Sequence, residues 1–499
     1  MILKTINSKL YVVLLVGLFG GMISSCKKDF MEVPPQGQLT SEQFPTSPEH
    51  ALLAVNGAYG SMRNWNYNYG GFPVADILSD DARKGSNPGD GAAMNLIDQF
   101  QYTPTQSTFS VYYAALYRSI LHANVVIEKV PDIAMDAELK NRYIAEARFL
   151  RAFHYFNYVR AYGDGVIVTT TSPDPEATRS PQSEIYKLII SDLEFAIETL
   201  PTKNGADYTA ADKGRATRGA AQALLARTYL YMKDFGNAQK YAEDVINSGD
   251  YDLEPNFGDV FTVASEFGIE SVFELGAFPQ TGGFINGGNQ YSNTQGVRGD
   301  PNNGWGFSRP SLDLINSFRD AGDTVRLDAT VIFVGEILGN GTDTIFGDEN
   351  TPDSTFENGQ LVEVETYNQK VYSTGNNEYQ WGNNVRYIRF AEVLLIAAEA
   401  ANKNGASGIA LTYLNRVRQR VGLGDINVTD QNQLDDIIFE ERRHELAMEQ
   451  HRFWDLVRTG RAPAVLGPLG FQEGKHELFP IPQAERDISG NRISQNPQW

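Results

Sequence analysis

Apolar residues recur every three to four positions over much of the chain, and proline and capping residues mark the ends of these segments. Such spacing is typical of amphipathic helices with one buried face. Ser47 followed by Pro48 predicts a helix start, because serine caps free backbone N–H groups and proline fits the first turn. Pro131 and Pro201 are expected to end the helices before them. We predict helices over residues 47–62, 107–130, 137–162, 183–200 and about 433–459.

Two predicted helical hairpins share one spacing of small and apolar residues, at offsets of 0, 12, 16 and 19. This is the spacing of a tetratricopeptide-type unit, in which small residues let two helices approach closely. Two ordinary alanine-rich hairpins are the alternative, and two units alone do not form a stable solenoid. The positions are Ala226, Ala238, Ala242 and Val245 in the first hairpin and Ala398, Ala410, Leu414 and Val417 in the second.

The composition changes between the two hairpins. Residues 268–306 contain ten glycines and five asparagines, which predicts loop and not core. Alternating apolar and polar residues within 330–373 predict a small β-hairpin or sheet. We therefore expect a mostly α-helical body with tetratricopeptide-like hairpins, long irregular loops and a small β excursion.

The overall composition excludes several classes of protein. With 41% apolar residues, the 499-residue chain has enough material for a full core, so intrinsic disorder is not expected. Its 62 acidic and 42 basic residues give a net charge of −20. Nucleic-acid binding and adsorption to anionic membrane surfaces both need concentrated Lys and Arg, so this charge disfavours them.

The single cysteine, Cys26, stands at the end of a segment typical of a secretory signal. Lys4 and Lys9 precede an apolar stretch over residues 10–23, which is shorter than the roughly 20 residues of a spanning helix. Two serines directly precede the cysteine and resemble a bacterial lipobox, although an ordinary secretory signal remains the alternative. We predict that residues 1–25 are a lipoprotein signal peptide and that Cys26 is lipidated. Residues 26–46 would then form a tether.

Motifs for catalysis are weak. The string from His444 to His451 fails as a zinc-protease motif, because Met448 occupies the position of the second histidine. Adjacent Asp80 and Asp81 are interpreted as a cap or loop pair. No nucleophile elbow or phosphate-binding glycine loop is recognisable, so we expect no enzyme, cofactor or metal. Charges spaced i,i+3 predict a ladder of ion pairs on a helix surface: Arg442–Glu445, Glu449–Arg452, Arg452–Asp455 and Asp455–Arg458.

Aromatic residues within polar loops are the strongest functional signal. Aromatic faces cover the apolar C–H faces of sugar rings, while amide side chains bind the hydroxyls. The alternative is that these rings only attach long loops to the helical body. The candidate glycan-binding residues are Trp65, Tyr67 and Tyr69 in one segment, Asn289, Tyr291, Asn302 and Trp305 in a second, and Trp381 in a third.

Several long segments resemble those of one known family. They include EARFLRAFHYFNYVRAYGD (146–164), RYIRFAEVLLIAAEAANKNG (386–405), FEERRHELAMEQHRFWDLVRTGR (439–461) and LFPIPQAERDISGNRISQNPQW (478–499). Together they are similar to the RagB/SusD family of outer-membrane lipoproteins. The chain departs from the family at Gln450, where a glycine is common, and at Trp499, where the family ends in Gly-Tyr.

The resemblance implies a function without chemical change to the ligand. A lipid-anchored protein exposed on the outer membrane of a Gram-negative bacterium would capture oligosaccharide and deliver it to a SusC-like TonB-dependent transporter, acting as its lid. It also implies a SusD-like N-terminal helical region over residues 47–250 and a C-terminal region with ligand loops over 251–499. A lid that binds another nutrient, such as peptide, is the alternative, and a hydrolase is a third hypothesis.

Overall fold

The computed structural model describes residues 44–68, 71–277, 290–299, 304–338, 341, 343–348, 354–357, 359–372 and 382–499. The predicted signal peptide, Cys26 and most of the tether lie outside these residues. Within the described residues, no helix is both long and apolar enough to cross a membrane.

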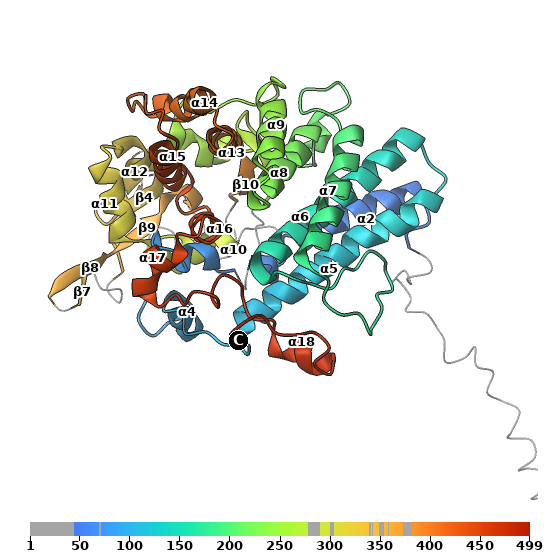
Figure 1. The fold of residues 1–499 in the computed structure, drawn as a ribbon, viewed down its shortest axis with the longest axis horizontal. Helices are drawn as coiled ribbons and strands as arrows, with labels where there is room; N and C mark the ends of the chain where they lie inside the picture. The colour runs from blue at the N-terminus through green and yellow to red at the C-terminus, as the bar shows by residue number, and fades with distance from the viewer. Residues whose placement is uncertain are drawn as a thin grey trace, which may run out of the picture.

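Four long helices lie side by side at one end of the molecule (Figure 1). Their caps agree with the sequence, since Ser47 Oγ accepts the N–H of His50 at 3.3 Å and Asp136 Oδ1 accepts the N–H of Leu139 at 2.9 Å. Each helix begins and ends within one residue of the predicted bounds, so these predictions are confirmed. The helices are α2 (Pro48–Ser61), α5 (Ser107–Lys129), α6 (Ala137–Tyr162) and α7 (Gln182–Thr199).

The two predicted hairpins follow, and they stack on each other through α9 and α13 (Figure 1). All eight small or apolar residues at the repeated offsets are fully buried, which confirms their predicted role in close helix packing. The hairpins are α8 (Arg218–Tyr231) with α9 (Phe235–Ile246), and α13 (Phe390–Lys403) with α14 (Ser407–Arg420).

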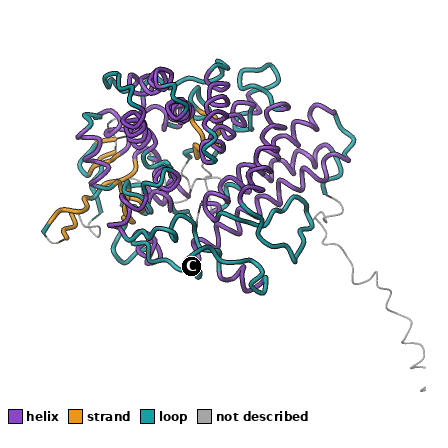
Figure 2. The backbone as a smooth tube through the Cα atoms, in the orientation of Figure 1, coloured by secondary structure: helices purple, strands orange, loops and turns teal. Residues whose placement is uncertain are grey.

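The strands of the described residues form small two-stranded antiparallel sheets around the helical body. One hairpin, β7–β8, projects from the body and is drawn in orange at its edge (Figure 2). The predicted β excursion within 330–373 is confirmed. The pairs are β1 (Ala82–Gly85) with β3 (Phe307–Pro310), β2 (Ser271–Leu275) with β10 (Val385–Arg389), β4 (Val331–Phe333) with β9 (Thr366–Asn368), β5 (Ile337–Leu338) with β6 (Asp343–Thr344), and β7 (Ser354–Glu357) with β8 (Gln360–Val364).

The remaining helices complete the body and position the loops. The α-helices among them are α3 (Val74–Ile77), α4 (Ala92–Asp98), α10 (Gln290–Gln295), α11 (Leu312–Asp320), α12 (Thr324–Thr330), α15 (Gln431–Leu446), α16 (Arg452–Arg458), α17 (Ala462–Leu466) and α18 (Gln483–Ile488). The 3-10 helices are η2 (Trp65–Asn68), η3 (Val130–Asp132), η4 (Ala210–Asp212), η5 (Phe257–Phe261), η6 (Val263–Ser265), η7 (Gln369–Val371) and η8 (Gly467–Leu469).

The prediction that residues 268–306 are loop and not core is wrong in part. This stretch contains β2 and α10, and residues 291–295 of α10 are buried. Their polar side chains find both distant and local partners: Asn368 Nδ2 donates to Gln295 Oε1 at 2.9 Å, and Thr294 Oγ1 donates to the carbonyl of Gln290 at 2.9 Å. The polar composition of this segment therefore predicted a loop where the structure has a buried helix.

The predicted continuous helix over residues 433–459 is broken in the structure. α15 ends at Leu446, and α16 begins at Arg452. In the turn between them, Met448 and Gln450 both have φ of 62°, a left-handed conformation that costs a residue with a side chain about 1–2 kcal/mol. The turn persists because distant groups bind its backbone: Asp76 Oδ1 accepts the N–H of Gln450 at 2.8 Å.

The predicted surface ladder of ion pairs is also wrong, apart from Asp455–Arg458 at 2.7 Å. The helices that carry these charges are buried, so most of the side chains pair with other elements and not with each other. Arg452 binds Asp80 at 2.8 Å, and Arg443 binds Asp81 at 2.7 Å. The two aspartates are therefore buried ion-pair partners, where a loop or cap role was expected.

One main hydrophobic core joins the N-terminal and C-terminal halves of the chain. It includes Phe153 of α6, Leu394 of α13, Trp454 of α16 and Phe479 of the C-terminal tail. Helices from both halves are thus held against each other in the interior of the molecule.

Candidate functional site

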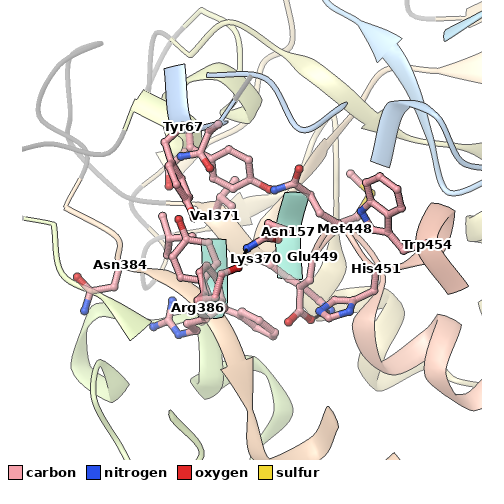
Figure 3. Close-up of a pocket in the computed structure, with 18 of the residues that line it drawn as sticks. Tyr67, Asn157, Lys370, Val371, Asn384, Arg386, Met448, Glu449, His451 and Trp454 are labelled. Carbon is pink, nitrogen blue, oxygen red and sulfur yellow. Dashed lines mark hydrogen bonds and ion pairs between the residues drawn. The ribbon is translucent and has the colours of Figure 1, made fainter. Parts of the chain in front are cut away.

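A cavity opens where η2, α6, α10, β10 and the turn between α15 and α16 converge (Figure 3). It contains about 920 Å³ of space between protein atoms, part of it open to solvent. The α6 helix contributes Phe153, Asn157 and Arg160, whose spacing of four and three residues places them on one helix face. The cavity is therefore built from segments far apart in the sequence.

Aromatic rings form much of the cavity wall. Tyr67 is fixed by its hydroxyl, which lies 2.7 Å from His154 Nδ1, and by its edge-on contact with Tyr112. Tyr387 packs against Phe153 with ring centroids 5.1 Å apart. Packing thus positions both rings without a ligand, and a hydrogen bond also holds Tyr67. The other aromatic residues of the wall are Phe261, Tyr291 and Trp454.

Polar groups stand between the rings. Arg160 Nη2 donates to Asn157 Oδ1 at 2.6 Å, and the guanidinium lies over the Trp454 ring at 5.0 Å. Burial raises the pKa of Tyr291 well above its usual value, and hydrogen bonds from the Gln295 and Gln450 side chains oppose this rise. Tyr291 therefore stays neutral, and the wall combines apolar ring faces with neutral and cationic hydrogen-bonding groups.

The charged residues at the base of the cavity are paired with each other. Lys370 Nζ donates to Glu449 Oε1 at 2.7 Å, and Arg389 Nε donates to Glu449 Oε2 at 2.7 Å. Burial disfavours the charge of Glu449, but Arg389 and Lys370 outweigh it and lower the pKa of Glu449 to about 2. Burial lowers the pKa of Lys370 to about 8. A glycosidase acid needs a raised pKa, so Glu449 suits a structural anion and not a proton donor.

A second aromatic group contains two of the predicted tryptophans. The rings of Trp65 and Trp305 meet edge to face, with centroids 5.8 Å apart, and both side chains are half-buried. The N–H of Trp305 donates to the carbonyl of Asn293 in α10 at 3.0 Å, so the pair connects η2 with the segment after α10. η2 also carries Tyr67, and α10, to which the backbone of Trp305 is hydrogen-bonded, carries Tyr291 at the cavity.

Gly71 is required for this tryptophan pair. Its φ is 87°, and a Cβ atom there would lie 2.1 Å from the Trp65 ring. We expect Gly71→Ala to displace Trp65 and to lower the free energy of unfolding by about 1–3 kcal/mol, because the new methyl group overpacks the site. Chemical denaturation measures this change. Gly60→Ala in α2, where nothing lies near the added methyl group, is the control and should stabilise the protein slightly. Equal stability changes in the two variants would contradict the requirement.

The predicted site residues are brought together only in part. Tyr67 and Tyr291 line the cavity, but they are 3% and 7% exposed, where open exposure on loops was expected. They are buried because η2 and α10 are short helices packed on the body. Trp65 and Trp305 form the neighbouring pair. The other predicted positions lie outside the described residues: Cys26, Tyr69, Asn289, Asn302 and Trp381.

Sequence reasoning missed several cavity residues because they lie in regular elements and not in polar loops. Tyr112 belongs to α5, and Asn157 and Arg160 belong to α6. The one available signal was the presence of Asn157 within a strongly apolar, aromatic helix segment, because an amide there needs a partner or a function. Tyr387 of β10 carried no comparable signal, and Gln450 of the α15–α16 turn stood out only as a departure from the glycine common in the resembling family.

No group of three or more His, Cys, Asp or Glu side chains in the described part of the chain is arranged to hold a metal ion. His451 lies on the cavity wall beside Glu392, with 3.9 Å between Nδ1 and Oε1. Burial lowers the pKa of His451 to about 4, which keeps the imidazole neutral at pH 7.

Comparison with known proteins agrees with this architecture. Residues 270–469 match the family model described as SusD family, and residues 58–230 match one described as starch-binding associating with outer membrane. SusD-like protein P2 of Formosa agariphila is 30% identical, and the match covers 98% of this chain and 99% of the relative.

Two solved structures have the same fold along nearly their whole length. A laminarin-binding SusD-like protein is 27% identical with a TM-score of 0.76, covering 91% of this chain and 100% of that one. Surface glycan-binding protein A of Bacteroides thetaiotaomicron, solved in complex with laminarihexaose, is 25% identical with a TM-score of 0.74, covering 90% and 100%. The resemblance found in the sequence is confirmed, and the chain belongs to the SusD family.

Proposed function

We propose that this protein is a surface glycan-binding lipoprotein of the outer membrane that captures oligosaccharide and delivers it to a SusC-like TonB-dependent transporter, for which it acts as a lid. The observation that carries the proposal is the aromatic cavity with Asn157, Arg160 and Gln450 in its wall, next to the Trp65–Trp305 pair. Ring faces can cover sugar C–H faces, and the polar groups can bind hydroxyls. Two structural relatives bear names that specify laminarin or laminarihexaose.

The ligand is bound without chemical change. Glu449, the acidic residue among the described residues that line the cavity, is held ionised by two cations, so it has no proton to give to a leaving group. Incubation of the protein with glycans should therefore release no new reducing ends. Their appearance in a preparation free of other hydrolases would contradict this part of the proposal.

Isothermal titration calorimetry of the full chain with laminarihexaose, maltohexaose and cellohexaose tests glycan binding. We expect saturable binding of at least one oligosaccharide in a wider panel built on these three. If the whole panel fails to bind while a barrel transporter co-purifies with the protein, the alternative of a lid for peptide or another nutrient gains support.

The proposed lipid anchor depends on Cys26. We expect Cys26→Ala to move the protein from the membrane fraction to the soluble fraction, because no other acylation site or spanning segment was recognised in the sequence. Membrane fractionation of cells that express each form measures this change. Ser25→Ala keeps the cysteine and should remain membrane-bound. Retention of the Cys26→Ala protein in the membrane fraction would contradict the anchor.

A further inference from the structure

The turn between α15 and α16 holds two residues in a backbone conformation that favours glycine. Met448 and Gln450 both have φ of 62°, and both residues contribute to the cavity lining. A glycine at either position would adopt this conformation without steric cost. Strained residues of this kind persist where the surroundings fix the backbone, and they occur often at ligand sites.

The turn does not depend on the Gln450 side chain for its shape. Its backbone is held by the hydrogen bond from the Gln450 N–H to Asp76 of α3. The side chain of Glu449, between the two strained residues, is held by Lys370 of η7 and Arg389 of β10. Three other elements therefore fix the turn, and a residue with no side chain at position 450 would be held in the same way.

The Gln450 side chain is instead directed to the ligand space. It is half-buried, lines the cavity and hydrogen-bonds with the Tyr291 hydroxyl. A glutamine amide has two N–H donors and an oxygen with two lone pairs, so one contact with Tyr291 leaves groups for a second partner. Tyr291 thus orients the amide at the cavity wall.

We propose that Gln450 determines ligand specificity: its side-chain amide, held in the cavity by a left-handed backbone and oriented by Tyr291, donates a hydrogen bond to a hydroxyl group of a neutral sugar. This inference rests on the proposed glycan-binding function. Glycine at position 450 would relieve the backbone strain. It would also remove the side chain, which is the part of this residue that contacts the ligand.

Gln450→Gly separates the two roles that the residue could have. Glycine relieves the backbone strain, so the Tm is expected to stay level or rise. Affinity for the tightest-binding oligosaccharide among laminarihexaose, maltohexaose and cellohexaose is expected to fall about fivefold or more, as for loss of one hydrogen bond. Gln498→Gly is the matched control, because Gln498 has φ of 61°, is exposed and lies outside the cavity wall. It carries the same change in residue type and should leave the affinity unchanged.

Gln450→Glu keeps the shape of the side chain but replaces the N–H donors by a carboxylate oxygen. We expect a similar loss of affinity with a Tm near that of the wild type.

Wild-type affinity in both Gln450 variants overturns the inference, and so does an equal loss of affinity in Gln498→Gly. If the wild type binds sugar and Trp305→Ala abolishes binding while both Gln450 variants bind normally, this inference alone fails. If the wild type binds neither the three sugars nor any member of the wider panel, both the proposed function and this inference are contradicted.

Discussion

Replacing Trp305 by alanine is expected to weaken oligosaccharide binding by about tenfold or more, and Trp65→Ala should have a similar effect. The two rings meet at 5.8 Å and are half-buried, so each supports the position of the other and keeps part of its surface open to a ligand. Removing either ring deletes a stacking surface and frees its neighbour. Calorimetric titration of each variant measures the change in Kd.

Trp499→Ala is the matched control for these variants. Trp499 stacks on Tyr102 with centroids 5.1 Å apart, and its indole N–H donates to the carbonyls of Lys475 and Leu478 at 3.0 Å. Its loss should lower the Tm and leave the affinity of the remaining folded protein unchanged. Unchanged binding in both Trp65→Ala and Trp305→Ala would refute the assignment of the tryptophan pair to the ligand site.

Replacing Arg389 by alanine should lower the free energy of unfolding by about 3–5 kcal/mol. The Arg389 side chain is 3% exposed and binds three carboxylates, those of Glu270, Glu445 and Glu449, at 2.6–2.8 Å. Its loss leaves buried negative charge with fewer partners. Arg492→Ala, which breaks an exposed pair with Glu176 at 3.3 Å, should change stability by less than about 1 kcal/mol. Denaturant titration of both variants gives the comparison.

The same network predicts how wild-type stability depends on pH. The pKa of Glu449 is about 2 in the folded protein, below the ordinary value of 4.5. A depressed folded pKa contributes stability that is fully present above pH 4.5 and is lost as the pH falls towards 2. In Arg389→Ala this contribution should shrink, so the stability of the variant should depend less on pH across that window. An unchanged pH profile would show that Arg389 does not hold the Glu449 charge.

The long helices could be predicted from sequence because their signals are local. Periodic apolar residues, Ser47 as a cap and prolines after the helix ends fix α2, α5, α6 and α7 without reference to the rest of the chain. The small residues of the two hairpins, such as Ala226 and Ala398, could be recognised for the same reason.

The break between α15 and α16 could not be predicted, because its causes lie far away in the sequence. Residues 447–451 have no proline or glycine, and the group that accepts the backbone N–H of Gln450 is the distant Asp76 side chain. The predicted ladder of ion pairs was wrong for a related reason. Spacing along a helix shows which charges can meet on its surface, but it does not show that Arg326, Arg389 and Arg420 will surround Glu445 in the interior.

Residues of the candidate site could be predicted only where they occur in segments of unusual amino-acid composition. Tyr67 and Tyr291 were found because aromatic residues among asparagines and glycines are rare in cores. Asn157 and Arg160 lie within α6, where the sequence resembles ordinary buried helix. Their place at the cavity follows from the packing of α6 against β10 and α16, which no local pattern encodes.

The way the α15–α16 turn is held has an evolutionary consequence. The anchors of this turn are Asp76, Lys370 and Arg389, and none of them depends on which side chain stands at position 450. A substitution there alters the cavity surface while these anchors keep the turn in place, so its main stability cost is the one that the positive φ imposes on any residue other than glycine. We therefore expect ligand preference to change through single substitutions at position 450 that leave the fold intact.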